Sequence, residues 1–232
     1  MVWAALKRLA GVLRRPRATL TDVAIAPRWV GVLVAVTLAA AAANAIFMNT
    51  EVGRQALVDQ WERTALAFGQ VVDDASYAQF QELSNRGPLY GVLSALLNVP
   101  AAIGAAAVLI YVTFGRGGVR VPFGTVLAVA AHTGVILALR TLVSAPIAYA
   151  RETTASATSL GVWFPAFDEA SPLAQLLGLV DLFAIWWAVV LAIGISVLYQ
   201  RRASRVAVAL VGVYLAGALV LALAMAAVGG TS

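Results

Sequence analysis

The chain has 232 residues, of which 62% are hydrophobic and 12% charged, and its formal net charge is +5. Its mean hydropathy of +0.88 lies far from that of soluble domains, in which about a quarter of residues are charged, and predicts an integral membrane protein without a separate soluble enzyme domain. The absence of cysteine and the single histidine exclude disulfides, thiol catalysis and a zinc site. The basic residues flank apolar segments, so we expect no cofactor and no nucleic-acid partner.

Residues 1–28 are predicted to form a cytoplasmic, amphipathic N-terminal segment. Apolar residues of 2–13 recur at helical spacing on one face, which is typical of a helix lying in the membrane interface with its cationic side toward lipid phosphates. The interfacial basic residues are Lys7, Arg8, Arg14 and Arg15. The alternative is an ordinary basic flank with incidental helicity. Pro16 ends this helix, and a second short helix is expected to stop before Pro27.

Five apolar segments follow, each long enough to cross a bilayer, and they define one membrane domain over 29–228. The predicted spans are 29–50, 89–114, 122–149, 172–199 and 206–228. The expected fold class is therefore an all-α integral membrane protein with five transmembrane helices. Asn98 and Pro100 interrupt the second span, where we expect a kink.

Two outer loops, 51–88 and 150–171, separate the spans on the other side of the membrane. The first loop carries six acidic residues against three arginines. Its apolar spacing predicts two amphipathic helices with a break near 73–76, where Asp or Ser can cap the second helix. These helices either cover the ends of the membrane helices or form a docking surface for a partner. The second loop has an aromatic run, 163–167, that fits an interfacial belt.

The charges of the segments outside the membrane predict the orientation of the chain. In chain order, the N-terminal segment and the four connections sum to +5, −3, +2, −2 and +3. Because basic segments stay on the cytoplasmic side, this alternation places the N-terminus in the cytoplasm and the C-terminus outside. Together with the near replacement of Lys by Arg, it favours the inner, or cytoplasmic, membrane of a prokaryote.

Four polar residues inside the spans form a candidate intramembrane polar cluster: Asn98, His132, Arg140 and Asp181. Counted inward from the outer ends of their spans, all but His132 lie at about the same depth, roughly 9 to 14 Å. We expect Arg140 to pair with Asp181 and Asn98 to complete the hydrogen bonds, because an unpaired charge there costs several kcal/mol. The alternative is that Arg140 extends to the headgroups and Asp181 faces the outer interface, without contact.

His132 lies nearer the middle of the membrane than the other three residues. A proton relay would need a carboxylate at the same depth, and none is evident. We therefore expect a packing histidine. The small residues of the last span and Gly194 of the fourth favour close helix packing rather than chemistry.

Two stretches carry a resemblance to a known family. Residues 15–20 read Arg-Pro-Arg-Ala-Thr-Leu ahead of Pro27, and residues 181–186 read Asp-Leu-Phe-Ala-Ile-Trp, running on to Leu-Ala-Ile-Gly at 191–194. With the five spans, this pattern resembles the prokaryotic branch of the Yip (Ypt-interacting protein) domain family over about residues 8–227. The residues that carry its most specific motif are Asp181, Phe183, Trp186 and Gly194.

The resemblance implies a five-span helical protein with a cytoplasmic N-terminus. Eukaryotic relatives bind Rab-type GTPases and act in vesicle traffic, whereas prokaryotic members resemble accessory proteins, some of them suspected beside ABC-type exporters. We therefore expect a non-enzymatic subunit or scaffold that associates with membrane lipids and with another membrane protein or a second copy of itself.

The alternative is a carrier or lipid-handling transporter that uses the intramembrane polar cluster. A membrane enzyme ranks third, because no nucleophile, metal or cofactor constellation is evident. A dry, mutually satisfied cluster favours the scaffold, and a hydrated cavity around the cluster favours transport.

Overall fold

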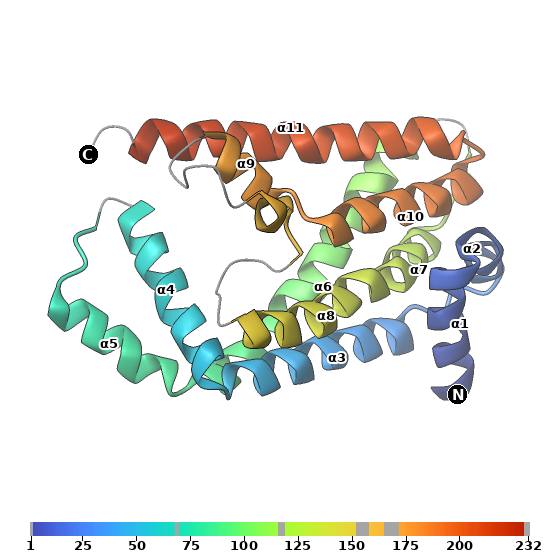
Figure 1. Ribbon diagram of the computed structural model, residues 1–232. Helices are drawn as coiled ribbons and strands as arrows, with labels where there is room; N and C mark the ends of the chain where they lie inside the picture. Colours follow the sequence, from blue (N-terminus) through green and yellow to red (C-terminus); the bar gives the residue numbers. More distant parts are fainter. Residues whose placement is uncertain (1, 68–69, 116–118, 152–157, 165–171, 230–232) are drawn as a thin grey trace. The chain divides into compact units, whose positions relative to one another are not determined.

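A computed structural model describes residues 2–67, 70–115, 119–151, 158–164 and 172–229 (Figure 1). Over these ranges the chain is helical, with one isolated β-bridge and no strand. The helices are α1 (Val2–Arg14), α2 (Pro16–Ile25), α3 (Val30–Met48), α4 (Glu51–Ala67), α5 (Asp74–Ser84), α6 (Gly87–Phe114), α7 (Phe123–Thr133), α8 (Val135–Arg151), η1 (Leu160–Trp163), α9 (Pro172–Leu179), α10 (Leu182–Tyr199) and α11 (Ala203–Gly229).

Five helical stretches are long and apolar enough to cross a membrane, which confirms the predicted all-α, five-span class. They are Val30–Met48, Gly87–Phe114, Phe123–Ile147, Leu182–Tyr199 and Ala203–Ala224. The third comprises α7 and the start of α8, which meet at Gly134. The fourth is shorter than the predicted 172–199, because the chain leaves the helix at Val180 and Asp181. One continuous helix over 172–199 was therefore a wrong prediction.

The chain divides into two compact units, each built from three separate stretches. Unit 1 contains Met1–Ala40, Ala95–Leu139 and Phe183–Tyr214, and unit 2 contains Ala41–Ser94, Arg140–Leu182 and Leu215–Ser232.

The core of unit 1 forms around α7. From Thr125 to Thr133 every residue except Leu127 is buried, and α1 and α2 both pack against this helix. The largest fully buried side chains around α7 include Leu20, Ile103 and Ile195, which come from three distant parts of the sequence. Burial of such side chains, at about 25 cal/mol per Å² of apolar surface, holds the N-terminal helices on the membrane helices of unit 1.

The N-terminal helices form a close pair. Val12 is buried, and Leu9 and Leu13 pack against the core of unit 1, so the second half of the apolar stripe of α1 contacts protein. Gly11 lies so near Thr19 that a Cβ at this position would overlap the threonine side chain. The expectation that α1 lies in the membrane interface stays a prediction.

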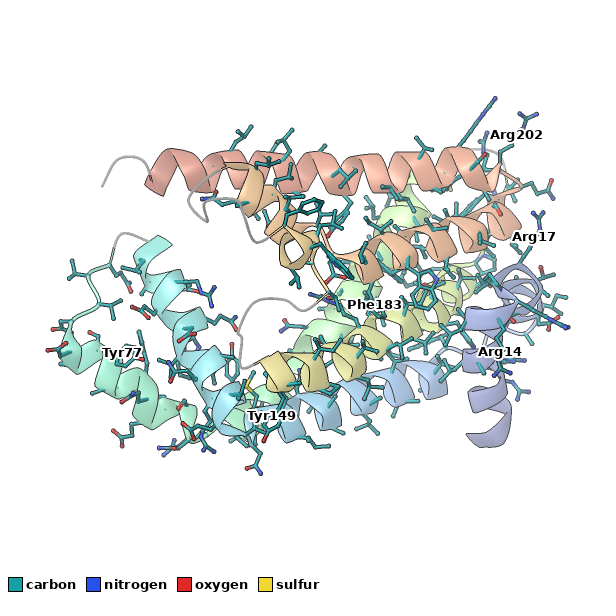
Figure 2. The ribbon with its side chains drawn as sticks, viewed as in Figure 1. Arg14, Arg17, Tyr77, Tyr149, Phe183 and Arg202 are labelled. Atoms are coloured by element: carbon teal, nitrogen blue, oxygen red, sulfur yellow. The ribbon has the colours of Figure 1, made fainter. Side chains whose placement is uncertain are left out.

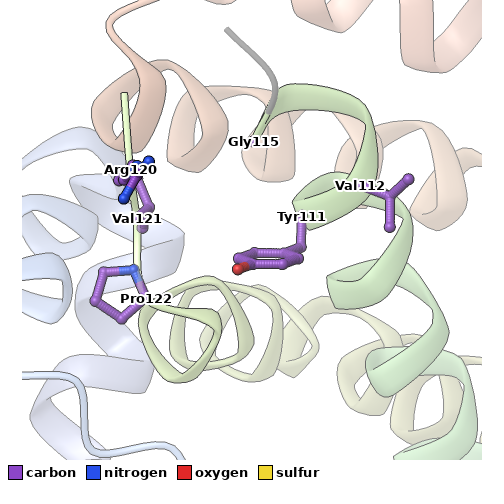
Figure 3. Close-up of a pocket in the computed structure, with 6 residues that line it drawn as sticks. All are labelled: Tyr111, Val112, Gly115, Arg120, Val121 and Pro122. Carbon is purple, nitrogen blue, oxygen red and sulfur yellow. The ribbon is translucent and has the colours of Figure 1, made fainter. Parts of the chain in front are cut away.

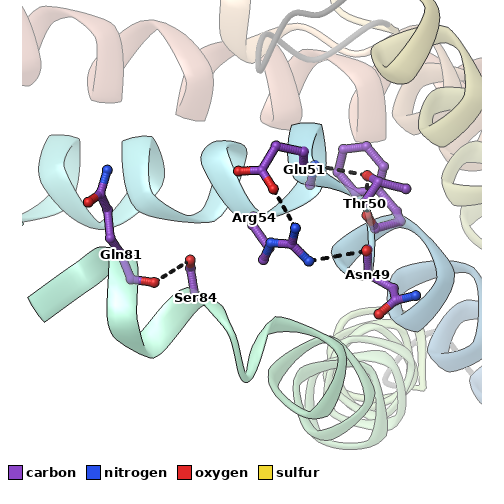
Figure 4. A network of polar contacts seen from close by, with 8 residues as sticks. Asn49, Thr50, Glu51, Arg54, Gln81 and Ser84 are labelled. Carbon is purple, nitrogen blue, oxygen red and sulfur yellow. Dashed lines mark hydrogen bonds and ion pairs between the residues drawn. The ribbon is translucent and has the colours of Figure 1, made fainter. Parts of the chain in front are cut away.

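The turn between α3 and α4 in unit 2 is fixed by polar contacts (Figure 4). The Thr50 hydroxyl donates to the Phe47 carbonyl at 2.6 Å and accepts from the Gly53 backbone N–H at 3.1 Å. A Cβ at Gly53 would overlap the Phe47 carbonyl, so the turn requires glycine there. Arg54 donates to the Asn49 carbonyl at 3.3 Å, which closes the turn, and it pairs with Glu51 in the first turn of α4.

Helices α4 and α5 are the two helices predicted for the first outer loop, and they pack against each other. The Trp61 ring lies 6.0 Å from that of Phe80 and 5.7 Å, edge-on, from that of Tyr90. Asp73 caps α5 by accepting a hydrogen bond from the Ser76 backbone N–H at 2.9 Å. Hydrogen bonds from Ser76 hold the pKa of the Asp73 carboxyl below its ordinary value. The predicted Asp cap is therefore present.

Gly194 on α10 packs tightly against α7. A Cβ there would overlap Val129 Cγ1, and a β-branched side chain has little rotameric freedom to yield. We expect Gly194→Ala to lower the stability of the chain in detergent by about 1–3 kcal/mol, measured by thermal unfolding. Gly212→Ala on α11 is the matched control, because nothing lies within 4 Å of its Cβ position. Equal stability of the two variants would contradict this packing, and Val129→Ala should partly rescue Gly194→Ala.

Candidate functional site

The candidate site lies where the fourth span begins, at the break between α9 and α10. Val180 and Asp181 lie outside both helices, and Asp181 pairs with Ser159 of the loop segment in an antiparallel bridge. The Leu160 N–H donates to the Val180 carbonyl at 2.8 Å, and the Leu182 N–H donates to the Thr158 carbonyl at 3.1 Å. A break in a membrane helix frees backbone groups that must be bonded elsewhere, and the loop segment bonds them here.

A close approach of two glycines helps to hold this loop segment in place. Gly161 of η1 packs on α9 so that a Cβ there would lie 3.3 Å from the Cα and N of Gly178. The loop segment therefore packs along α9, and Thr158 lies next to Asp181.

The Asp181 side chain is nearly enclosed and is bonded twice at one oxygen. The residue is 5% exposed, its Oδ2 lies 2.9 Å from Arg140 Nε, and the Thr158 hydroxyl donates to the same Oδ2. The Arg140 side chain is 42% exposed. The pair therefore joins a buried carboxylate to a guanidinium that also reaches the open surface of unit 2.

The surroundings of Asp181 compensate the negative charge of its carboxylate. Arg140 supplies the opposite charge, and Thr158 supplies a neutral donor to the charged form. Asp181 also directly precedes the first residue of α10, where the helix dipole favours a negative charge. The local charges are therefore compensated by the chain itself.

The structure brings together two of the four residues of the predicted polar cluster. Arg140 and Asp181 form the expected ion pair. Thr158 donates a hydrogen bond to the same carboxylate, and the hydrogen bond expected from Asn98 stays a prediction. Asn98 is exposed on the part of α6 that belongs to unit 1, and its side chain makes no hydrogen bond to any described residue.

His132 also belongs to unit 1 and is fully buried. Its Nδ1 donates to the Ala128 carbonyl at 2.7 Å, which fixes the ring along its own helix. Its Nε2 has no partner among the residues that the structure describes. Next to it, Thr133 accepts a hydrogen bond from Trp187 Nε1 at 3.3 Å, which ties α7 to α10.

The other residues of the predicted motif are structural. Phe183 lies near the start of α10 (Figure 2). Its ring lies 5.8 Å from that of Trp186, and both pack against the core of unit 1. Gly194 packs against α7. Of the interfacial basic residues, Arg14 and Arg15 are exposed, while Arg8 donates to the Ala26 carbonyl at 3.4 Å. The Lys7 side chain lies outside the described residues.

Thr158 and Ser159 were not singled out from the sequence. They belong to the polar loop 150–171, where no periodicity or motif marks one hydroxyl over another. The available signal was indirect: a carboxylate at the start of a span needs a second donor besides one arginine.

The comparisons with known proteins agree with the membrane architecture. A family model described as "Yip1 domain" matches residues 10–225. The comparison with curated proteins and the comparison with solved structures gave no match.

We expect Arg140→Gln to destabilise the chain by about 1–3 kcal/mol, because it leaves the buried Asp181 carboxylate without its counter-charge. The expected loss of stability is modest because the Arg140 side chain is 42% exposed, and exposure weakens an ion pair. Adding Asp181→Asn should recover part of the loss, since no charge then remains uncompensated. Thermal unfolding in detergent measures both effects.

Arg54→Gln is the matched control, because its partner Glu51 is exposed on α4 and such surface pairs contribute about 0–1 kcal/mol. If Arg140→Gln and Arg54→Gln have the same small effect, the buried pair does not stabilise the fold.

Proposed function

Because this chain belongs to the Yip1 domain family, we propose that it is a non-enzymatic membrane subunit, a scaffold that acts by associating with other membrane proteins. The observation that supports this role most directly is the enclosure of Asp181. Its carboxylate is bonded by Arg140 and Thr158 and is 5% exposed, so the strongest polar group at the start of the fourth span is used to hold the chain's own fold.

The first outer loop offers the contact surface for such a role. Exposed apolar side chains on the spans are covered by lipid, but α4 and α5 lie outside the candidate spans. Around the tip of this hairpin, Leu66 and Val71 are exposed, Val71 to 88%, and Leu83 is exposed at the other end of α5. Exposed apolar groups rimmed by acidic residues are typical of a protein contact site.

The charge pattern supports a particular placement of the chain. We propose that it lies in the inner membrane of a prokaryote with its N-terminus in the cytoplasm and its C-terminus outside, because the basic segments alternate with acidic ones. The α4–α5 hairpin then faces outward, where it would meet the partner, a transport complex or a second copy of this chain.

One observation favours a carrier as the second candidate. Substrate sites of membrane transporters are commonly built at discontinuous helices, and the α9–α10 break carries a carboxylate and a half-exposed guanidinium. A carrier requires water or solute to reach Asp181, whereas a scaffold requires that it stay closed.

The scaffold role can be tested by photo-crosslinking in native membranes with a benzophenone amino acid at Val71. We expect a defined adduct of fixed mass, identified by mass spectrometry as one membrane protein or as a second copy of this chain. The same probe at Gln79, an exposed polar position on α5, is the matched control.

The added substitution Leu66→Ser should weaken the Val71 adduct severalfold, because it removes apolar contact area next to the probe. No adduct, or the same diffuse pattern at Val71 and Gln79, would contradict a specific contact at the hairpin tip.

A further inference from the structure

A pocket of about 630 Å³ opens in unit 1 where α6 ends and the chain enters α7 (Figure 3). The residues that line it are Tyr111, Val112, Gly115, Arg120, Val121 and Pro122. Its volume lies in the range of small-molecule sites, about 300–1,000 Å³. Because the spans Gly87–Phe114 and Phe123–Ile147 end on either side of it, the pocket lies at the level of the lipid headgroups.

The lining has the two parts that a phospholipid needs. Arg120 is exposed and brings a guanidinium, and the Tyr111 ring extends across the pocket toward Val121 and Pro122 with its hydroxyl at the far end (Figure 3). Val112 continues the lining on the exposed, apolar side of α6. A guanidinium and a phenol can bind a phosphate, while the apolar side accepts the glycerol and the first acyl carbons.

Aromatic contacts hold this part of unit 1 in place. The Tyr111 ring packs edge-on against Phe123 at 5.6 Å, and Phe114 lies 5.8 Å from Tyr199 at the end of α10. The second contact brings the end of α6 next to the end of α10. The Tyr111 ring is therefore held in place before any ligand arrives, which lowers the entropy lost on binding.

The charge around the pocket selects an anionic ligand. Unit 1 contains eleven of the sixteen basic residues of the chain and one acidic residue, Asp22. Three exposed arginines follow the end of α10, which the Phe114–Tyr199 contact places beside the end of α6. They are Arg201, Arg202 and Arg205. Polybasic segments beside membrane spans attract anionic lipids by about 1 kcal/mol per basic residue.

From these observations we infer that the pocket at Tyr111 and Arg120 is a binding site for the headgroup of an anionic phospholipid. Arg120 binds the phosphate, Tyr111 donates a hydrogen bond to it, and Val112 contacts the upper acyl chain. The site needs only the membrane location of the chain and is independent of the scaffold role.

The test uses the full chain purified in detergent and titrated with dioleoylphosphatidylglycerol, with bound lipid counted by native mass spectrometry. We expect one lipid retained per chain, and dioleoylphosphatidylcholine retained at least about tenfold more weakly. Arg120→Gln should weaken retention about tenfold, because it removes a charge-assisted hydrogen bond, and Tyr111→Phe severalfold without changing the charge. Arg28→Gln, an exposed arginine of unit 1 away from the pocket lining, should have less than about a threefold effect.

Three results would overturn the assignment. Equal losses for Arg120→Gln and Arg28→Gln would show attraction by the basic surface as a whole. Equal retention of the two lipids would show that the pocket does not select for a negatively charged headgroup. Displacement of the lipid by millimolar inorganic phosphate, with phosphate bound in its place, would make the pocket a free-phosphate site. Thermal unfolding of each variant shows that the fold is retained.

Discussion

Unit 2 contains a carboxylate, Asp181, that is almost fully buried directly before a membrane span. The need to compensate its charge constrains the structure around it. Removing an ion from water costs several kcal/mol unless charge and hydrogen bonds replace the lost hydration. Asp181 meets this demand with Arg140 from α8 and Thr158 from the loop segment before η1, so one side chain ties α8 and this loop segment to the start of α10. The need to bond buried polar groups also explains the path of the loop segment at 158–160. Its backbone forms hydrogen bonds with the backbone groups that the α9–α10 break leaves free.

The distribution of charge follows the two units. Unit 2 contains ten of the eleven acidic residues of the chain, and unit 1 contains most of the arginines. In a membrane protein such separation sets which surface meets the anionic leaflet and which meets the opposite side. In the proposed orientation, the basic residues of unit 1 would contact lipid, and the acidic hairpin of unit 2, held by Trp61, would contact protein.

Hydropathy alone predicted the five spans, because each is a long apolar run with few charges. Counting residues inward from the span ends also predicted the Arg140–Asp181 pair. The break after Leu179 was missed, since 172–180 is uncharged and mostly apolar, and the pairing of Asp181 with Ser159 is a tertiary contact that the sequence does not reveal. The contact of α1 with the core of unit 1 was missed for a related reason. An apolar stripe on a helix has the same sequence pattern whether lipid or protein covers it.

Whether the Asp181 site is closed can be measured directly, because the chain has no cysteine. Ser159 is 3% exposed and pairs with Asp181, while Trp163, in the same loop segment, is 69% exposed. In membrane vesicles, a membrane-impermeant thiol reagent should modify the Ser159→Cys variant at least about tenfold more slowly than the Trp163→Cys variant, since reactivity follows exposure. Equal rates would show water at the buried carboxylate, contradict the closed structural pair, and favour a carrier.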